Sequence, residues 1–152
     1  MRKRKEFKKE YYLQKITNAH LWKLFGLKFI TVEVQLDDLR FDGLAYDKKA
    51  KSFVIIEYKN KIDFEVLNQG ETYYNLLQDN HQAYIDRFNE KFDCDFDEED
   101  FDFKKTKVMI IGPEFTKEQI ERSESPKYPF ELYRAALYQC DEESYCITYE
   151  QI

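Results

Sequence analysis

Two short segments carry residue types that together could do chemistry: Asp42-Gly43 and, fourteen residues later, Glu57-Tyr58-Lys59. In a strand, Glu57 and Lys59 share one face and Tyr58 lies on the other. Two neighbouring carboxylates repel, and each raises the pKa of the other unless a cation is present. If Asp42 sits beside Glu57, the pair therefore favours a divalent cation that prefers hard oxygen ligands, such as Mg²⁺, Mn²⁺ or Ca²⁺.

Lys59 suits a different role in the same place. An ammonium group is a poor metal ligand, but it can orient an attacking water or stabilise the charge of a phosphorane-like transition state. The alternative interpretation is a surface hairpin in which Glu57 and Lys59 are solvated charges on one face. Charged residues make up 36% of the chain, so that interpretation needs no site at all.

The residues around these segments predict a β-hairpin that brings them together. Residues 40–46 are a run of polar and then apolar side chains, and residues 47–51 form a charged reversal. Residues 53–56 are four consecutive apolar residues, three of them β-branched, as in a buried strand. The end of the first strand and the end of the second would then lie side by side.

Three stretches in this order resemble the PD-(D/E)XK nuclease superfamily. Residues 39–46 resemble its R-(I/F/V)-D strand, residues 53–59 its vviE-x-K strand, and residues 69–77 the following helix with its Q…Y element. The similarity is greatest to small NucS/EndoMS-like and RecB-like nuclease domains, and it covers roughly residues 21–138. Phe41 stands where many members have a proline before the first aspartate.

The resemblance implies a Mg²⁺- or Mn²⁺-dependent endo- or exonuclease whose substrate is nucleic acid, with DNA expected. Asp42, Glu57 and the backbone carbonyl of Tyr58 would hold the metal ion. Lys59 would act on the attacking water or on the transition state. Gln69, near the start of the following helix, would hydrogen-bond Lys59 or a substrate phosphate.

The resemblance also implies an α/β fold, the restriction-endonuclease-like core, with a mixed central β-sheet flanked by helices in the order α-βββ-α-β-α-β. Residues 1–152 are expected to form a single domain of this kind. The hydrophobic periodicity places its elements. They are a helix over 7–25 ended by Gly26, strands over 28–36, 40–46 and 53–59, a helix over 63–91 that breaks at Asn80-His81, a buried strand over 107–111, a short helix capped by Thr116 and Gln119, and strands over 130–138 and 145–149.

Composition excludes several classes of protein. No apolar run is long enough to span a bilayer, and no apolar segment follows the basic first residues, so neither a membrane protein nor a secretory signal is expected. Three cysteines and two histidines are too few for a disulfide framework or a zinc site. These observations favour a reducing cytoplasm.

Charge is distributed unevenly along the chain. Residues 1–28 carry +7, which leaves −13 for the rest of a chain whose net charge is −6. Two interpretations of the basic start stay open: a solvated end, or a basic helix that follows the phosphates of DNA through Arg2, Lys3, Arg4, Lys5, Lys8 and Lys9. Residues 86–102 hold nine acids, but they lack the central glycine and final glutamate of an EF-hand. A solvated loop or an acidic patch for a partner is expected there.

Several other side chains could belong to the site or to ordinary structure. Glu10 on the first helix and Glu33 on the preceding strand could each add a carboxylate. Tyr73 lies four residues after Gln69 and so on the same helical face, and core packing is its expected role. His20, His81 and the cysteines are expected to be structural.

Two functions of other classes fit the same residues. One is a catalytically silent nuclease fold that binds nucleic acid or a protein partner. The other is an acidic protein that mimics nucleic acid through residues 86–102. Since no separate recognition domain accompanies the expected core, high sequence specificity would need a homodimer or a partner protein.

Overall fold

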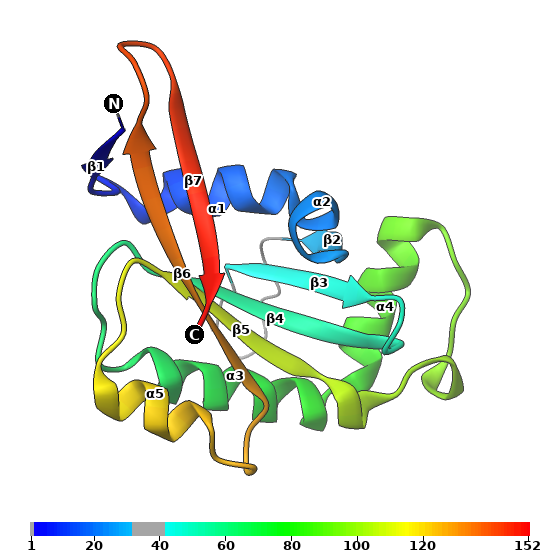
Figure 1. The fold of residues 1–152 in the computed structure, drawn as a ribbon. Coiled ribbons are helices and arrows are strands. Elements are labelled where there is room, and N and C mark those ends of the chain that lie inside the picture. The colour runs from blue at the N-terminus through cyan, green and yellow to red at the C-terminus, as the bar shows by residue number, and fades with distance from the viewer. Residues whose placement is uncertain (1, 32–41) are drawn as a thin grey trace.

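The computed structural model describes residues 2–31 and 42–152, and within them seven strands form one mixed sheet (Figure 1). The strand order is β1-β6-β5-β4-β3-β2, and β7 pairs with β6. In chain order the elements are β1 (Lys3–Lys5), α1 (Glu10–Ala19), α2 (Leu21–Phe25), β2 (Lys28–Thr31), β3 (Gly43–Asp47), β4 (Ser52–Tyr58), α3 (Val66–Asp79), α4 (His81–Phe92), β5 (Lys107–Gly112), α5 (Lys117–Ser123), β6 (Phe130–Gln139) and β7 (Tyr145–Gln151).

This arrangement confirms the predicted fold class, a mixed sheet flanked by helices in the order α-βββ-α-β-α-β. β5 runs parallel to both β4 and β6, and the other pairs are antiparallel. The α1–α2 segment lies on one face of the sheet, and α3 and α5 lie on the other (Figure 1). β1 and the β6–β7 hairpin extend the sheet beyond the core.

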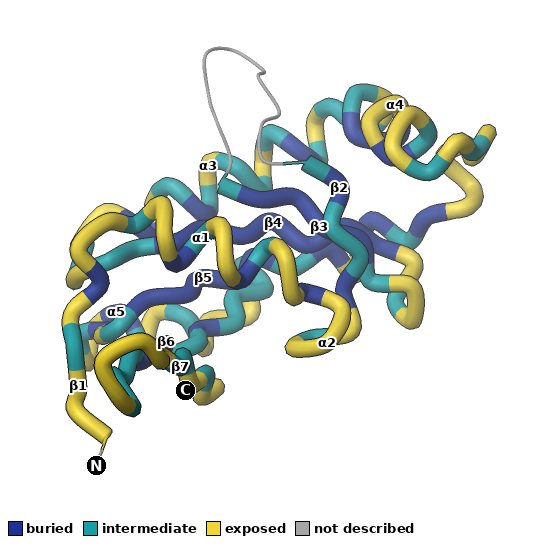
Figure 2. The backbone as a smooth tube through the Cα atoms, turned by 90° about the horizontal axis from the view of Figure 1, so that it is seen from above, coloured by how far each residue is buried: buried dark blue, intermediate teal, exposed yellow. Residues whose placement is uncertain are grey.

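The central strand β4 is buried along its whole length (Figure 2). Its alternate residues pack into two separate cores, as the pleat of a strand requires. Phe53 and Ile55 belong to the core beneath α3 and α4, whereas Ile56 and Tyr58 belong to the core that contains Leu13 of α1. Any polar residue that continues this strand is therefore shielded from water by helices on both sides.

The N-terminal part of the chain differs from the prediction in two ways. The helix expected over residues 7–25 is broken at His20 into α1 and α2, and it ends as predicted at Gly26, whose φ of 69° is left-handed. Of the two interpretations of the basic start, the helical one is wrong in its conformation, because Lys3–Lys5 form the strand β1, antiparallel to β6. A chain of three charged residues has no intrinsic strand preference, and the end of β6 provides its hydrogen-bonding partner.

Most of the remaining boundaries were predicted correctly. The long helix does break at Asn80, and Thr116 and Gln119 do form a reciprocal capping box at the start of α5. β2 covers only residues 28–31 of the expected strand, with an irregular register between Phe29 and Thr31. Its expected continuation, including Glu33, and residues 40 and 41 of the next strand lie outside the described residues.

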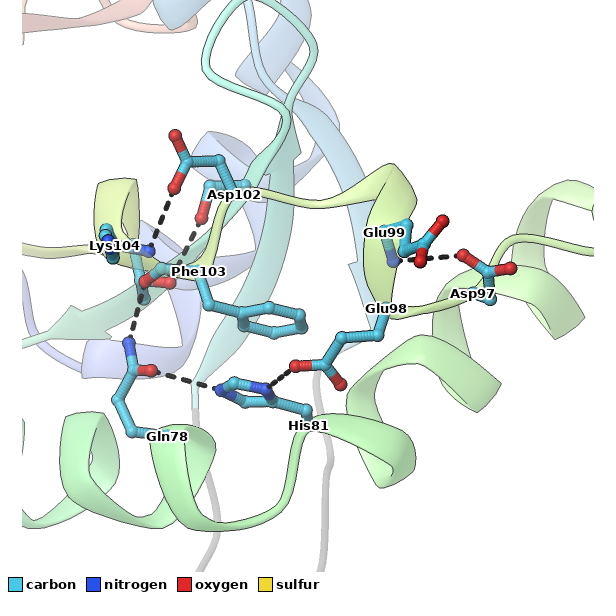
Figure 3. A network of polar contacts seen from close by, with 10 residues as sticks. Gln78, His81, Asp97, Glu98, Glu99, Asp102, Phe103 and Lys104 are labelled. Atoms are coloured by element: carbon cyan, nitrogen blue, oxygen red, sulfur yellow. Dashed lines mark hydrogen bonds and ion pairs between the residues drawn. The ribbon is translucent and has the colours of Figure 1, made fainter.

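The acidic segment is anchored rather than freely solvated (Figure 3). His81 pairs through Nδ1 with Glu98 and through Nε2 with Oε1 of Gln78, 3.1 Å away. The imidazole also stacks on Phe103 at a centroid distance of 3.5 Å, and Nε2 of Gln78 donates to the carbonyl of Phe103. The acids themselves are exposed, but Phe101 and Phe103 join the core, so the segment closes the end of the domain. No described helix has the length and apolarity needed to cross a membrane.

Candidate active site

Asp42 and Glu57 meet where the β3–β4 hairpin opens. Gly43 and Ile56 are the last paired residues of the hairpin, so Asp42 and Glu57 each lie one residue beyond that pair. The backbone N–H of Asp42 donates to Oε1 of Glu57 at 3.4 Å, and the N–H of Tyr58 donates to Oδ2 of Asp42 at 2.9 Å. These two contacts bring the carboxyl groups of Asp42 and Glu57 close together at the end of the hairpin.

Burial gives this pair unusual acid–base properties. Glu57 is only 3% exposed, and burial together with the negative charge of Asp42 raises its pKa well above the ordinary value. Burial also raises the pKa of Asp42, although the hydrogen bonds from Tyr58 and Glu57 offset part of the effect. Without a cation, the pair therefore retains a proton that free carboxylates would lose.

Helix α1 holds the backbone of Asp42 in place. Nε2 of Gln14 donates to the Asp42 carbonyl at 2.9 Å, and Nδ2 of Asn18 approaches the same oxygen at 3.4 Å. The hydroxyl of Tyr58 in turn donates to Oδ1 of Asn18. The first helix thus acts on the site through its polar side chains, which sequence patterning did not single out.

Lys59 follows β4 and continues its pairing, since its N–H donates to the carbonyl of Ile111 at 2.9 Å. Its ammonium group lies 3.1 Å from Oδ2 of Asp63, and its side chain is only 16% exposed. Burial alone would lower the pKa of Lys59, but the hydrogen bond to Asp63 and the charges of Glu10, Asp63 and Glu57 outweigh burial and raise it. Lys59 is therefore a permanent cation at neutral pH and cannot serve as a general base.

The charge of Asp42 acts on two further residues, Glu10 and Tyr73. Burial raises the pKa of Glu10, the charge of Lys59 lowers it and the charge of Asp42 raises it, so a role for Glu10 at the site stays a prediction. Burial and the charges of Glu57 and Asp42 raise the pKa of the Tyr73 phenol to about 12. The expected core packing of Tyr73 is confirmed, since it packs partly buried against the core beneath α3 and α4.

Gln69 is the site candidate that the structure links least to the others. Its backbone N–H donates to Glu65 inside α3, and within the described residues no hydrogen bond joins its side chain to Lys59. Asp63 occupies that position instead, a partner that sequence reasoning missed even though it lies four residues after Lys59. A catalytic role for Gln69 stays a prediction.

The donor set suits a small hard cation. Asp42 and Glu57 supply two carboxylates, and a divalent ion could replace the proton that the raised pKa of Glu57 retains. Within the parts of the chain that the structure describes, no three His, Cys, Asp or Glu side chains are grouped closely enough to hold a metal ion. Mg²⁺ is commonly bound by one or two carboxylates and keeps several waters. Two carboxylates are therefore enough for Mg²⁺, but not for an ion that needs protein ligands on every side.

Comparisons with known proteins identify no family. No protein-family model matches the chain. An uncharacterized protein of Haemophilus influenzae is 34% identical over 131 residues, and the match covers 86% of this chain and 43% of that protein. The chain therefore spans less than half the length of this relative.

One solved structure is similar in outline. It is a repair endonuclease from Pyrococcus abyssi, with a TM-score of 0.47 and 13% sequence identity over 83% of this chain and 47% of that one. A TM-score below 0.5 is too low to carry an argument about function. The chemistry of the site must be inferred from its own residues.

Proposed function

We propose that this chain is a metal-dependent nuclease that hydrolyses phosphodiester bonds, with DNA as the substrate. One observation carries the proposal: the half-buried carboxylate of Asp42 meets the buried carboxylate of Glu57, beside the permanently charged Lys59. Holding two such groups together away from water is costly unless a cation compensates them. A site for a divalent cation explains why both stand there.

The residues divide into ligands and charge stabilisers. Asp42, Glu57 and the backbone carbonyl of Tyr58 would hold Mg²⁺ or Mn²⁺. The bound ion would act as a Lewis acid and lower the pKa of a coordinated water. Lys59, kept protonated by Asp63 and by Glu10, would stabilise the negative charge that develops on the phosphate.

Tyr73 would add a neutral hydrogen-bond donor. Its pKa of about 12 keeps the phenol protonated at physiological pH, so it could donate to a phosphate oxygen or to the attacking water. Substitution by phenylalanine would test this role, because the ring and its packing would be kept. We expect Tyr73→Phe to slow cleavage without changing the melting temperature by more than a few degrees.

The test separates ligands from charge stabilisers by two readouts, cleavage of a labelled DNA and thermal stabilisation by Mn²⁺. Glu57→Ala and Asp42→Ala should abolish both, because a lost ligand loses the ion. Lys59→Ala should abolish cleavage and largely retain stabilisation by the metal. Lys48→Ala, an exposed lysine in the turn of the same hairpin, is the matched control and should change neither.

Equal residual cleavage by wild type, Glu57→Ala and Lys59→Ala would mean that a contaminant cuts the DNA, and the nuclease proposal would then be wrong. If the wild type also fails to gain stability with millimolar Mn²⁺, the metal site is wrong as well. A binding module of nuclease-like architecture would be the function left to test.

A further inference from the structure

The turn between β4 and α3 presents an aromatic ring to solvent on a rigid support. Phe64 is 73% exposed. The residue before it, Asp63, is fixed three times: its carboxylate pairs with Lys59 at 3.1 Å and accepts from the Glu65 N–H at 2.8 Å, and its carbonyl accepts from Nε2 of Gln119 at 2.7 Å. The ring therefore stands one residue from the ion pair of Lys59, on a backbone that cannot easily turn it inward.

Single exposed apolar side chains are ordinary, and most need no explanation. Phe64 differs because its neighbour Asp63 belongs to the candidate site. Tyr11, 57% exposed, likewise follows Glu10 on α1. Two exposed rings thus follow directly, in the sequence, residues whose charges act on Lys59.

A cavity of about 640 Å³ adjoins the same loop. Asn60, Lys61 and Ile62 line it from the loop after β4, together with residues 4–7 at the end of β1 and just after it, and residues 113–114 after β5. Its charged lining consists of three cations and two acids, which are Arg4, Lys5, Lys61, Glu6 and Glu114. Nδ2 of Asn60 approaches the Phe7 carbonyl at 3.4 Å and links the two walls.

The size and placement of this cavity limit what can enter it. Its volume falls within the ~300–1,000 Å³ range of small-molecule pockets, which suits the sugar and phosphate of one strand and is far too small for a duplex. Ile62, in its wall, lies two residues before Phe64. Lys61 also lies in this wall, three residues before Phe64. A nucleic-acid strand whose phosphates contact Lys61 would therefore place its bases near the ring of Phe64.

We propose that the site takes an unpaired nucleic-acid strand, with a phosphate in the cavity of Arg4, Lys5 and Lys61 and a base stacked on Phe64. Bases inside a duplex have no free face, whereas unpaired bases stack on aromatic side chains without regard to sequence. This inference rests on the proposed function, since it places the scissile bond at Asp42 and Glu57. Its binding part can be measured without cleavage.

The experiment measures binding by fluorescence anisotropy in EDTA, so that no strand is cut. The probes are a labelled oligothymidylate of about a dozen nucleotides, within the ~4–16 nucleotide sites of single-strand binders, and a duplex of the same length. Phe64→Ala and Phe64→Leu should each weaken binding of the single strand roughly five- to a hundred-fold, because neither has a π-face. Phe64→Trp should restore it, and duplex binding should be equally weak in all variants.

Trp22→Ala is the matched control. Trp22 is 63% exposed, but it lies on α2, away from the loops after β4 and β5, so its loss should leave the affinity unchanged. An oligouridylate arm distinguishes RNA from DNA: equal affinity for both would assign the site to either polymer. The inference is wrong if Phe64→Ala binds the single strand as tightly as wild type, or if the wild type prefers the duplex.

The same samples, given Mg²⁺, separate this inference from the proposed function. Binding that depends on Phe64 without any cleavage by the wild type would support the strand site and refute the nuclease. Cleavage that depends on Glu57 but not on Phe64 would support the nuclease and refute the strand site.

Discussion

In the metal-free protein, stability should fall as the pH rises through the pKa of Glu57, and Glu57→Gln should remove that loss. Burial and Asp42 raise the folded-state pKa of Glu57 well above its ordinary value of 4.5. Between those two pKa values the folded protein keeps a proton that the unfolded chain has released. Stability from this proton is fully present below about pH 4.5 and is lost as the pH rises through the folded pKa.

The size of the effect follows from one proton. Its uptake changes the free energy of unfolding by at most about 1.4 kcal/mol per pH unit. For a domain of this size that corresponds to a fall in Tm of roughly 3–6 °C per pH unit. Gln at position 57 keeps the shape of Glu and can donate to Asp42, but it carries no charge. The variant should therefore be more stable than the metal-free wild type above the folded pKa.

The assay is thermal unfolding followed by circular dichroism in EDTA across a pH series, with Glu118→Gln on α5 as an exposed control that should follow the wild type. The difference between wild type and Glu57→Gln isolates this group from every other titration. Mn²⁺ should then stabilise only the wild type, by about 2.7 kcal/mol at a concentration of 100 times Kd. A Glu57→Gln variant less stable than wild type at every pH would show that the two carboxylates are not coupled as described.

Three further outcomes follow from the packing and the charge. A Cβ on Gly70 would lie 2.7 Å from the ring of Phe130, so Gly70→Ala should lower the free energy of unfolding by about 1–3 kcal/mol in urea titrations, despite the higher helix propensity of alanine. Thr17→Val leaves the Tyr149 hydroxyl without its 2.6 Å partner and should cost about 1 kcal/mol by the same measurement. Lys61→Gln should reduce the slope of log affinity against log salt by about 0.7 for single-stranded DNA, and an unchanged slope would exclude a phosphate contact.

The sequence predicted the elements best where a single strong pattern decided them. The β-branched run before Glu57 and the capping pair of Thr116 and Gln119 are local signals, and both have the expected structure. The strand β1 could not be predicted, because Lys3–Lys5 carry no apolar alternation and owe their conformation to a partner more than 130 residues away. The residues next to β1 in the sequence carry no pattern that reveals its pairing with the distant strand β6.

The site divides in the same way. Asp42 and Glu57 were predictable as neighbours because one hairpin joins them, and Lys59 follows by alternation. Asp63, Tyr73 and the polar side chains of α1 reach the pair only through tertiary packing. Their residue types are too common for sequence alone to distinguish them from surface or core residues.

The pairing of β1 with β6 has a consequence for the order of folding. Asp42 and Glu57 are separated by a short hairpin, so closing that loop costs little entropy and the carboxylates can meet early. Arg4 and Lys5 reach their places only when residues 3–5 find residues 137–139, a contact that spans nearly the whole chain. The cationic wall of the cavity should thus be the last part of the site to form and the first to be lost on partial unfolding. Hydrogen exchange should find the amides of β1 far less protected than those of β4. On partial unfolding, the domain should then lose its affinity for a nucleic-acid strand before the Asp42–Glu57 pair is disrupted.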